Sequence, residues 1–192
     1  MGTRDSILQA VTANKPDLIA LPDMDLSLTI QYPELLDQFV QMVHAAGGQA
    51  FYKNANQELQ NDLALVKAAG KFIINLLEEP HSQDCSAMNS SELETLDTCY
   101  LRADLAVAEN GAMWIPETHM ANRLIPFICQ HLVIVLNPVV IINNMHEAYQ
   151  QLNVSAEGFG VFIAGPSKTA DIEQNLVIGA HGARSLRVYI IE

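Results

Sequence analysis

The chain has 192 residues, of which 49% are hydrophobic and 17% charged, so composition excludes a disordered protein and predicts a sizeable core. Ten basic against 22 acidic side chains give a net charge of −12, which disfavours nucleic acid as a partner. The three cysteines, Cys85, Cys99 and Cys129, lack the paired spacing of zinc or iron–sulfur ligands, so we expect reduced thiols.

Two features predict a soluble, cytoplasmic chain with no membrane span. The longest apolar stretch, Leu132–Ile142, is interrupted by Asn137 and Pro138, which leaves too few consecutive apolar residues for a membrane helix. The first ten residues carry Arg4 and Asp5 and contain no apolar run of signal-peptide length.

Helical and strand patterns alternate over the first 77 residues. Apolar side chains recur three and four residues apart in two segments, and Gly47 and Gly70 are typical of helix ends. The predicted elements, in order, are a helix around 7–11, an amphipathic helix over 33–48, a strand over 49–52, a helix over 58–69 and a strand over 71–77.

Residues 80–98 are polar and rich in serine, which predicts a surface segment that leads into a short helix. Its cap is expected near Ser90 or Ser91, with Glu94 at capping-box spacing. The predicted elements that follow are a hairpin of 103–108 and 112–115, a helix over 120–130, a strand over 132–136, a capped helix over 143–152, and strands over 159–164 and 186–191.

Strands of nearly continuous apolar character that alternate with helices indicate an α/β fold. We expect three layers, built on a mainly parallel sheet with helices on both faces and an appended β-hairpin. No internal repeat or low-complexity linker divides the chain, so residues 1–192 are predicted to form a single domain.

A candidate ligand loop follows the predicted strand over 159–164. Gly165 and Pro166 lead into Ser167, Lys168 and Thr169. Glycine lets backbone N–H groups approach a ligand, a hydroxyl can cap the helix expected next, and lysine adds charge that favours an anion. The loop is therefore a candidate anion or carboxylate site at the carboxyl end of a parallel strand. The alternative is a tight turn with a good helix cap.

Two acids follow this loop. Asp171 and Glu173 stand in a predicted helical segment that ends near Gly179, and residues two apart do not share a helical face. They can bond a ligand hydroxyl, hold the loop, or be ordinary first-turn acids.

A second candidate is Glu109, which precedes Asn110 and Gly111 at the expected hairpin turn. A carboxylate in apolar surroundings suits proton transfer or attack on an activated acyl group. The alternative is a turn acid bonded to backbone N–H groups. His181, beside Gly182, can reach a ligand or lie exposed, and the spacing of the other histidines and cysteines predicts no metal site.

Together these segments resemble the lactate-utilisation protein C family, also called the LUD domain. The likeness is close over residues 100–192 and looser before them. Its most specific part is the run Gly-Pro-Ser-Lys-Thr-Ala-Asp-Ile-Glu at 165–173. The other matching segments are 103–112, 124–126, 131–135 and 179–184.

This resemblance implies an α/β fold similar to the sugar-phosphate isomerase and coenzyme A transferase group. It also implies a bacterial subunit that takes part in oxidation of L-lactate to pyruvate with partner proteins that carry iron–sulfur clusters, and it identifies no cofactor. The family usually has threonines where this chain has Asn110 and Ala112, and proline where it has Ala183.

Three functions follow as hypotheses. The first is an accessory subunit of lactate utilisation that binds a small organic acid or phosphorylated cofactor at the Gly165 loop beside Glu109. The second is an acyl, formyl or coenzyme A transferase or ligase in which Glu109 is catalytic. The third is a docking partner without a small-molecule ligand. The candidate ligand-binding residues are Asn110, Gly111, Gly165, Pro166, Ser167, Lys168, Thr169, Asp171, Glu173, His181 and Gly182.

Overall fold

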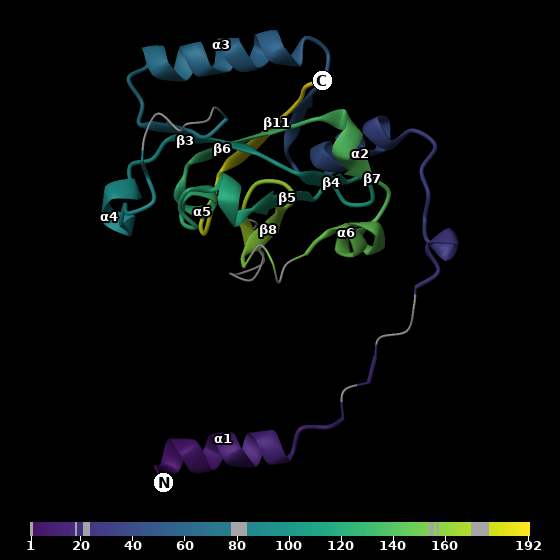
Figure 1. Ribbon diagram of the computed structural model, residues 1–192. Helices are drawn as coiled ribbons and strands as arrows, with labels where there is room; N and C mark the ends of the chain where they lie inside the picture. Colours follow the sequence, from purple (N-terminus) through teal and green to yellow (C-terminus); the bar gives the residue numbers. More distant parts are fainter. Residues whose placement is uncertain are drawn as a thin grey trace.

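The computed structural model describes residues 2–17, 19–20, 24–77, 84–153, 156, 158–169 and 177–192. Its main feature is a parallel sheet with strand order β1-β11-β6-β3-β2 (Figure 1). These strands are β1 (Gln49–Phe51), β11 (Ser185–Ile190), β6 (His131–Leu136), β3 (Thr98–Arg102) and β2 (Ile73–Asn75). The predicted α/β class with a mainly parallel sheet is therefore confirmed.

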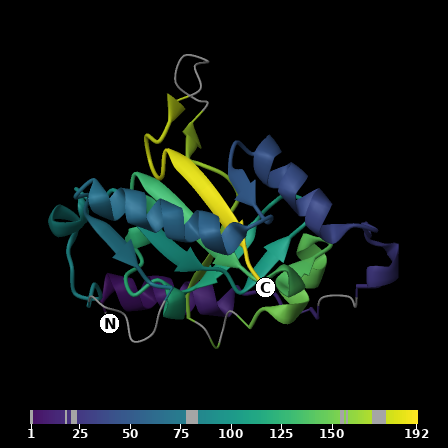
Figure 2. The same ribbon diagram turned by 90° about the horizontal axis from the view of Figure 1, so that it is seen from above.

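Helices cover both faces of this sheet, as predicted. On one face lies α3 (Ala55–Ala68), which crosses over the strands when the molecule is seen from above (Figure 2). On the other lies α2 (Leu35–Ala45), which buries Phe39 and Val43 in the main core cluster. The central strand β6 sends alternate side chains to the two cores, Leu132 and Ile134 to one and Val133 and Val135 to the other. Its unbroken apolar run follows from this burial on both faces.

The predicted hairpin is confirmed and belongs to a second, four-stranded sheet of order β7-β4-β5-β8. In the hairpin, Leu105 is paired with Trp114 in antiparallel register. One face of the second sheet packs into the main core and the other packs under α6 (Met145–Gln151). Its strands are β7 (Ile141–Ile142), β4 (Leu105–Val107), β5 (Met113–Pro116) and β8 (Gly160–Ile163).

The remaining elements are short, apart from the first helix. They are α1 (Thr3–Ala13), η1 (Leu26–Leu28), α4 (Ser90–Leu93), η2 (Glu117–His119), α5 (Ile125–Ile128), η3 (Pro138–Val140), β9 (Lys168–Thr169) and β10 (Val177–Ile178). The helix predicted over 120–130 is thus reduced to the four residues of α5, because Ala121 and Asn122 form a bend and Arg123 and Leu124 a turn before it.

The predicted cap of α4 is corrected by one or two residues. Asn89 is the cap, because its side-chain oxygen accepts hydrogen bonds from the N–H groups of Ser91 and Glu92. The carboxylate of Glu92, not that of Glu94, closes the capping box by accepting from the N–H of Asn89 at 2.8 Å.

Helix α1 lies apart from the two sheets, as Figure 1 shows, and none of its residues is buried. Its apolar side chains Ile7, Leu8 and Val11 are 59%, 49% and 55% exposed. The helical spacing of these residues predicted the helix correctly but not its contacts.

Gly160 lies where the indole of Trp114 fills the space that a side chain would need. A Cβ at Gly160 would stand 2.1 Å from Cζ2 of Trp114, which is buried and packs on Phe162 with 4.9 Å between ring centroids. We expect Gly160→Ala to lower the free energy of unfolding by about 2 kcal/mol because the ring must shift within a packed layer. Urea denaturation measures this loss. The exposed control Gly2→Ala should leave the midpoint unchanged, and an unchanged midpoint for Gly160→Ala would contradict the prediction.

Candidate functional site

The loop after β8 is held against the end of α2. Gly165 has φ +90°, and a Cβ there would lie 2.6 Å from the carbonyl oxygen of Ala46, so only glycine fits without displacement. The N–H of Ser167 donates to the carbonyl of Ala183 at 2.9 Å, and the N–H of Gly179 donates to the carbonyl of Ser167 at 3.0 Å. These bonds join the Gly165 loop to the segment that carries His181.

A cavity of about 310 Å³ lies between these two segments, and we call it the Gly165 cavity. It brings together five of the predicted ligand-binding residues: Gly165, Ser167, Lys168, His181 and Gly182. Lys168 and His181 are exposed, whereas Ser167 is half-buried beside Gly182. Pro126, Phe127, Leu132 and Phe162 contribute an apolar wall.

The segment after the Gly165 loop was predicted to be helical, but its described residues form strands. Lys168 and Thr169 form β9, which pairs in antiparallel register with Val177–Ile178 of β10. This hairpin projects from the body of the molecule in Figure 2. Thr169 is therefore paired in a ladder and does not cap a helix. Asp171 and Glu173 lie outside the described residues.

Glu109 stands at the β4–β5 turn and is tied to the start of α6. Its Oε2 accepts a hydrogen bond from the N–H of Met145 at 3.0 Å, and its own N–H donates to the carbonyl of Asn143 at 2.9 Å. This is the geometry of a turn acid bonded to backbone. The described residues that line the Gly165 cavity do not include Glu109.

The other two residues of this turn shape the backbone. Asn110 accepts from the N–H of Ala112 at 3.0 Å, and Gly111 has φ +72° where a Cβ would lie 3.0 Å from the backbone nitrogen of Val43. The turn thus packs on α2 one turn of helix before Ala46, which Gly165 contacts. Helix α2 contacts both candidate loops.

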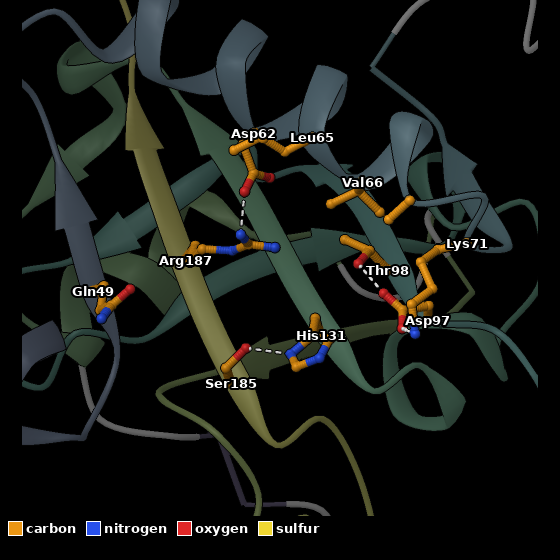
Figure 3. A pocket seen from close by; sticks show the side chains of 11 residues that line it. Gln49, Asp62, Leu65, Val66, Lys71, Asp97, Thr98, His131, Ser185 and Arg187 are labelled. Carbon is orange, nitrogen blue, oxygen red and sulfur yellow. Dashed lines mark hydrogen bonds and ion pairs between the residues drawn. The ribbon is translucent and has the colours of Figure 1, made fainter.

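A second, larger cavity was not predicted from the sequence. It measures about 500 Å³ and lies between α3 and the amino ends of the parallel strands, so we call it the amino-edge cavity (Figure 3). The lining residues are Gln49, Asp62, Leu65, Val66, Ala69, Lys71, Asp97, Thr98, His131, Ser185 and Arg187. Asp62 lies in the apolar stripe of α3 with Leu59 and Leu63. A charged residue at such a position was the feature of the sequence that could have indicated a buried polar site.

An ion pair bridges the helix and the sheet inside this cavity. Nη1 of Arg187 donates to Oδ1 of Asp62, while the hydroxyl of Tyr100 donates to Oδ2 at 2.9 Å. Asp62 is only 9% exposed. Burial, together with the hydrogen bond to Asp62, raises the pKa of the Tyr100 phenol well above its ordinary value.

Two further sets of polar side chains line the amino-edge cavity. His131 and Ser185 are partners in the β6–β11 register, and Nδ1 of His131 is 2.8 Å from Oγ of Ser185. Asp97 accepts from the hydroxyl of Thr98 at 2.9 Å and faces Nζ of Lys71 at 3.3 Å. Burial opposes ionisation of Asp97, but the bonds from Thr98 and Lys71 outweigh it and lower the pKa of the carboxyl.

Metal-binding groups and membrane-spanning helices are both absent from the described residues. Within that part of the chain, no three His, Cys, Asp or Glu side chains come together as a metal-binding group. None of the described helices combines the length and the apolar character that crossing a membrane requires.

Several known proteins are similar to this chain in sequence. The sequence profile of the LUD domain matches residues 64–191. A lactate utilization protein C from Bacillus pumilus is 31% identical over 86 residues, which are 42% of this chain and 36% of that protein. One from Anoxybacillus flavithermus is 27% identical over 150 residues, or 78% of this chain and 66% of that protein. The chain thus spans about a third to two thirds of the length of these relatives.

Among solved structures, a DUF162 family protein from Deinococcus radiodurans superposes with a TM-score of 0.59 at 16% sequence identity. The match covers 85% of this chain and all of that one. The likeness supports the α/β fold described above.

Proposed function

The chain belongs to the LUD domain family, and we propose that it acts in bacterial lactate utilisation as a subunit that binds a small organic anion in the Gly165 cavity. The names of its relatives support the pathway. The resemblance further suggests that it works with partner proteins that carry iron–sulfur clusters.

The observation that carries this proposal is the convergence of Lys168, His181 and Ser167 on one cavity. The chain carries a net charge of −12, so its surface as a whole repels anions. Lys168 and His181, beside the hydroxyl group of Ser167, form a local exception to this repulsion. The apolar wall formed by Phe127 and Phe162 suits the carbon skeleton of a small acid.

Side chains, rather than the Ser167 N–H, would hold this ligand. That N–H already donates to Ala183, so it is not available to orient an anion. Nζ of Lys168 supplies charge, and Oγ of Ser167 can donate to the same carboxylate or phosphate. The proposal gives Glu109 no catalytic role, because its carboxylate binds the N–H of Met145 in the first turn of α6.

Replacing Lys168 tests the proposal. Calorimetric titration with L-lactate and with pyruvate should detect binding of at least one of them, and Lys168→Ala should weaken it about tenfold because a charge-assisted bond is lost. Lys67→Ala, an exposed lysine on α3, is the matched control and should leave the affinity unchanged. Equal affinities for the wild-type chain and Lys168→Ala would remove the ligand role of the Gly165 loop.

A further inference from the structure

The amino-edge cavity is separate from the Gly165 cavity, and the two have no lining residue in common. They lie on opposite faces of the sheet at the start of β6, where His131 lines the first and Leu132 the second. A ligand site in α/β folds is usually sought at the carboxyl ends of the strands, so nothing in the fold class predicts a site at this edge.

Strand register places the polar groups of this cavity on one surface. Ser185, His131 and Thr98 are aligned across β11, β6 and β3. Arg187 lies two residues beyond Ser185 and therefore on the same face of β11. Figure 3 shows these side chains below α3, with Asp62 reaching down from the helix to Arg187.

The guanidinium of Arg187 is only partly used by its ion pair. Its Nη1 is bonded to Asp62, but its Nε is buried and has no hydrogen-bond partner among the described residues. A buried donor without a partner is costly, and the planar guanidinium offers its donors in a fork that matches an oxyanion. The hydroxyl and imidazole of the Ser185–His131 pair lie on the same face as this donor.

The cavity also has an acceptor side. Asp97, which is 20% exposed at its side chain and paired with Lys71, supplies carboxylate oxygens to the lining. Leu65 and Val66 of α3, together with Ala69 at its C-cap, line the cavity with apolar surface. Such a lining suits a small molecule that combines an anionic group with hydroxyl groups, and a volume of about 500 Å³ is in the range of ligand pockets.

We propose that the amino-edge cavity is a second binding site, in which Arg187, Ser185 and His131 receive the oxyanion of a small hydroxylated carboxylate or phosphate and Asp97 accepts from its hydroxyl groups. The site is independent of the proposed function at the Gly165 loop. Asp62 is a positioning residue, because it holds the guanidinium through Nη1 and leaves the other N–H groups of the guanidinium for the ligand.

Titration with two charged probes and an uncharged one tests this site. Glycerate carries a carboxylate and glycerol 3-phosphate a phosphate, each beside two hydroxyl groups, while glycerol offers hydroxyl groups without charge. We expect at least one charged probe to bind with a Kd below about 10 mM and to shift the amide NMR signals of Thr98, His131 and Ser185, whereas glycerol does neither. The probe that binds more tightly identifies the type of anion.

Two variants separate a ligand role from a structural one. Arg187→Lys keeps a cation beside Asp62 but removes the planar fork of guanidinium donors, and Ser185→Ala removes the hydroxyl. Each should weaken binding of the charged probe, by about tenfold and about threefold respectively, while circular dichroism shows a folded chain. Lys168→Ala should leave this binding unchanged, which distinguishes the site from the Gly165 cavity. The proposal is overturned if neither charged probe binds, or if affinity is the same in both folded variants as in the wild-type chain.

Discussion

Asp62→Ala is expected to destabilise the protein by about 3 kcal/mol. The change leaves the Arg187 guanidinium, 22% exposed at its side chain, without its acceptor, and it removes the acceptor of the buried Tyr100 hydroxyl. Breaking a buried pair costs more than the pair contributes, because the remaining charge keeps its desolvation penalty. Urea denaturation measures the loss, and in a chain of this size it corresponds to a fall in Tm of about 6–12 °C.

A control on the same helix and a double-mutant cycle complete this experiment. Glu58→Ala changes an exposed acid of α3 and should alter stability by no more than about 0.5 kcal/mol. Asp62→Leu combined with Arg187→Met should be less destabilising than the sum of the two single changes, because no unpaired charge remains. Additive effects would show that the two side chains are not coupled.

Alkaline pH is expected to unfold the protein through its buried thiols and phenols. Burial raises the pKa of Cys129 from 9.0 to about 12 and that of Tyr189 from 10.0 to about 12. Burial, followed by the neighbouring thiols, also raises the pKa of Cys99 well above 9.0. Above pH 9 the unfolded chain loses these protons while the folded chain keeps them, so the free energy of unfolding falls as pH rises from 9 toward 12.

The size of this loss follows from the number of groups. Each contributes a slope of at most about 1.4 kcal/mol per pH unit, so the cysteines alone should lower stability by more than about 3 kcal/mol between pH 9 and pH 11. Urea titrations at pH 7, 9, 10 and 11 measure the slope. Cys129→Ala should reduce this slope by the contribution of one cysteine, even though the variant is less stable at pH 7. A slope that is the same in both proteins would contradict the assignment to Cys129.

Much of the fold was predictable because the strongest signals are local. The run 132–136 had to be buried on both faces, and the Asn110-Gly111 turn between apolar segments had to form a hairpin. Gly165, Lys168 and His181 were named together as candidate ligand-binding residues, and they line the same cavity. The prediction was wrong for Val177–Ile178, which form strand β10 by pairing with β9. Nothing in their own sequence indicates that partner.

The amino-edge cavity could not be predicted, because its residues are ordinary when taken singly. Asp62 and Arg187 are 125 positions apart, and neither is part of a motif. Only strand order brings them together, since β11 lies between β1 and β6 below α3. An acid within the apolar stripe of a helix and an arginine within an apolar strand each indicate a buried partner, but sequence alone does not pair them.

The position of β11 also has a consequence for biosynthesis. It is the last of the described strands along the chain, yet it lies inside the parallel sheet and bonds to β1 on one side and β6 on the other. A ribosome releases the chain from its N-terminus, so β1 has no neighbour and Asp62 no cation until the final strand emerges. The parallel sheet therefore stays open until β11 is available, and β1 and β6 each keep an unpaired edge until then.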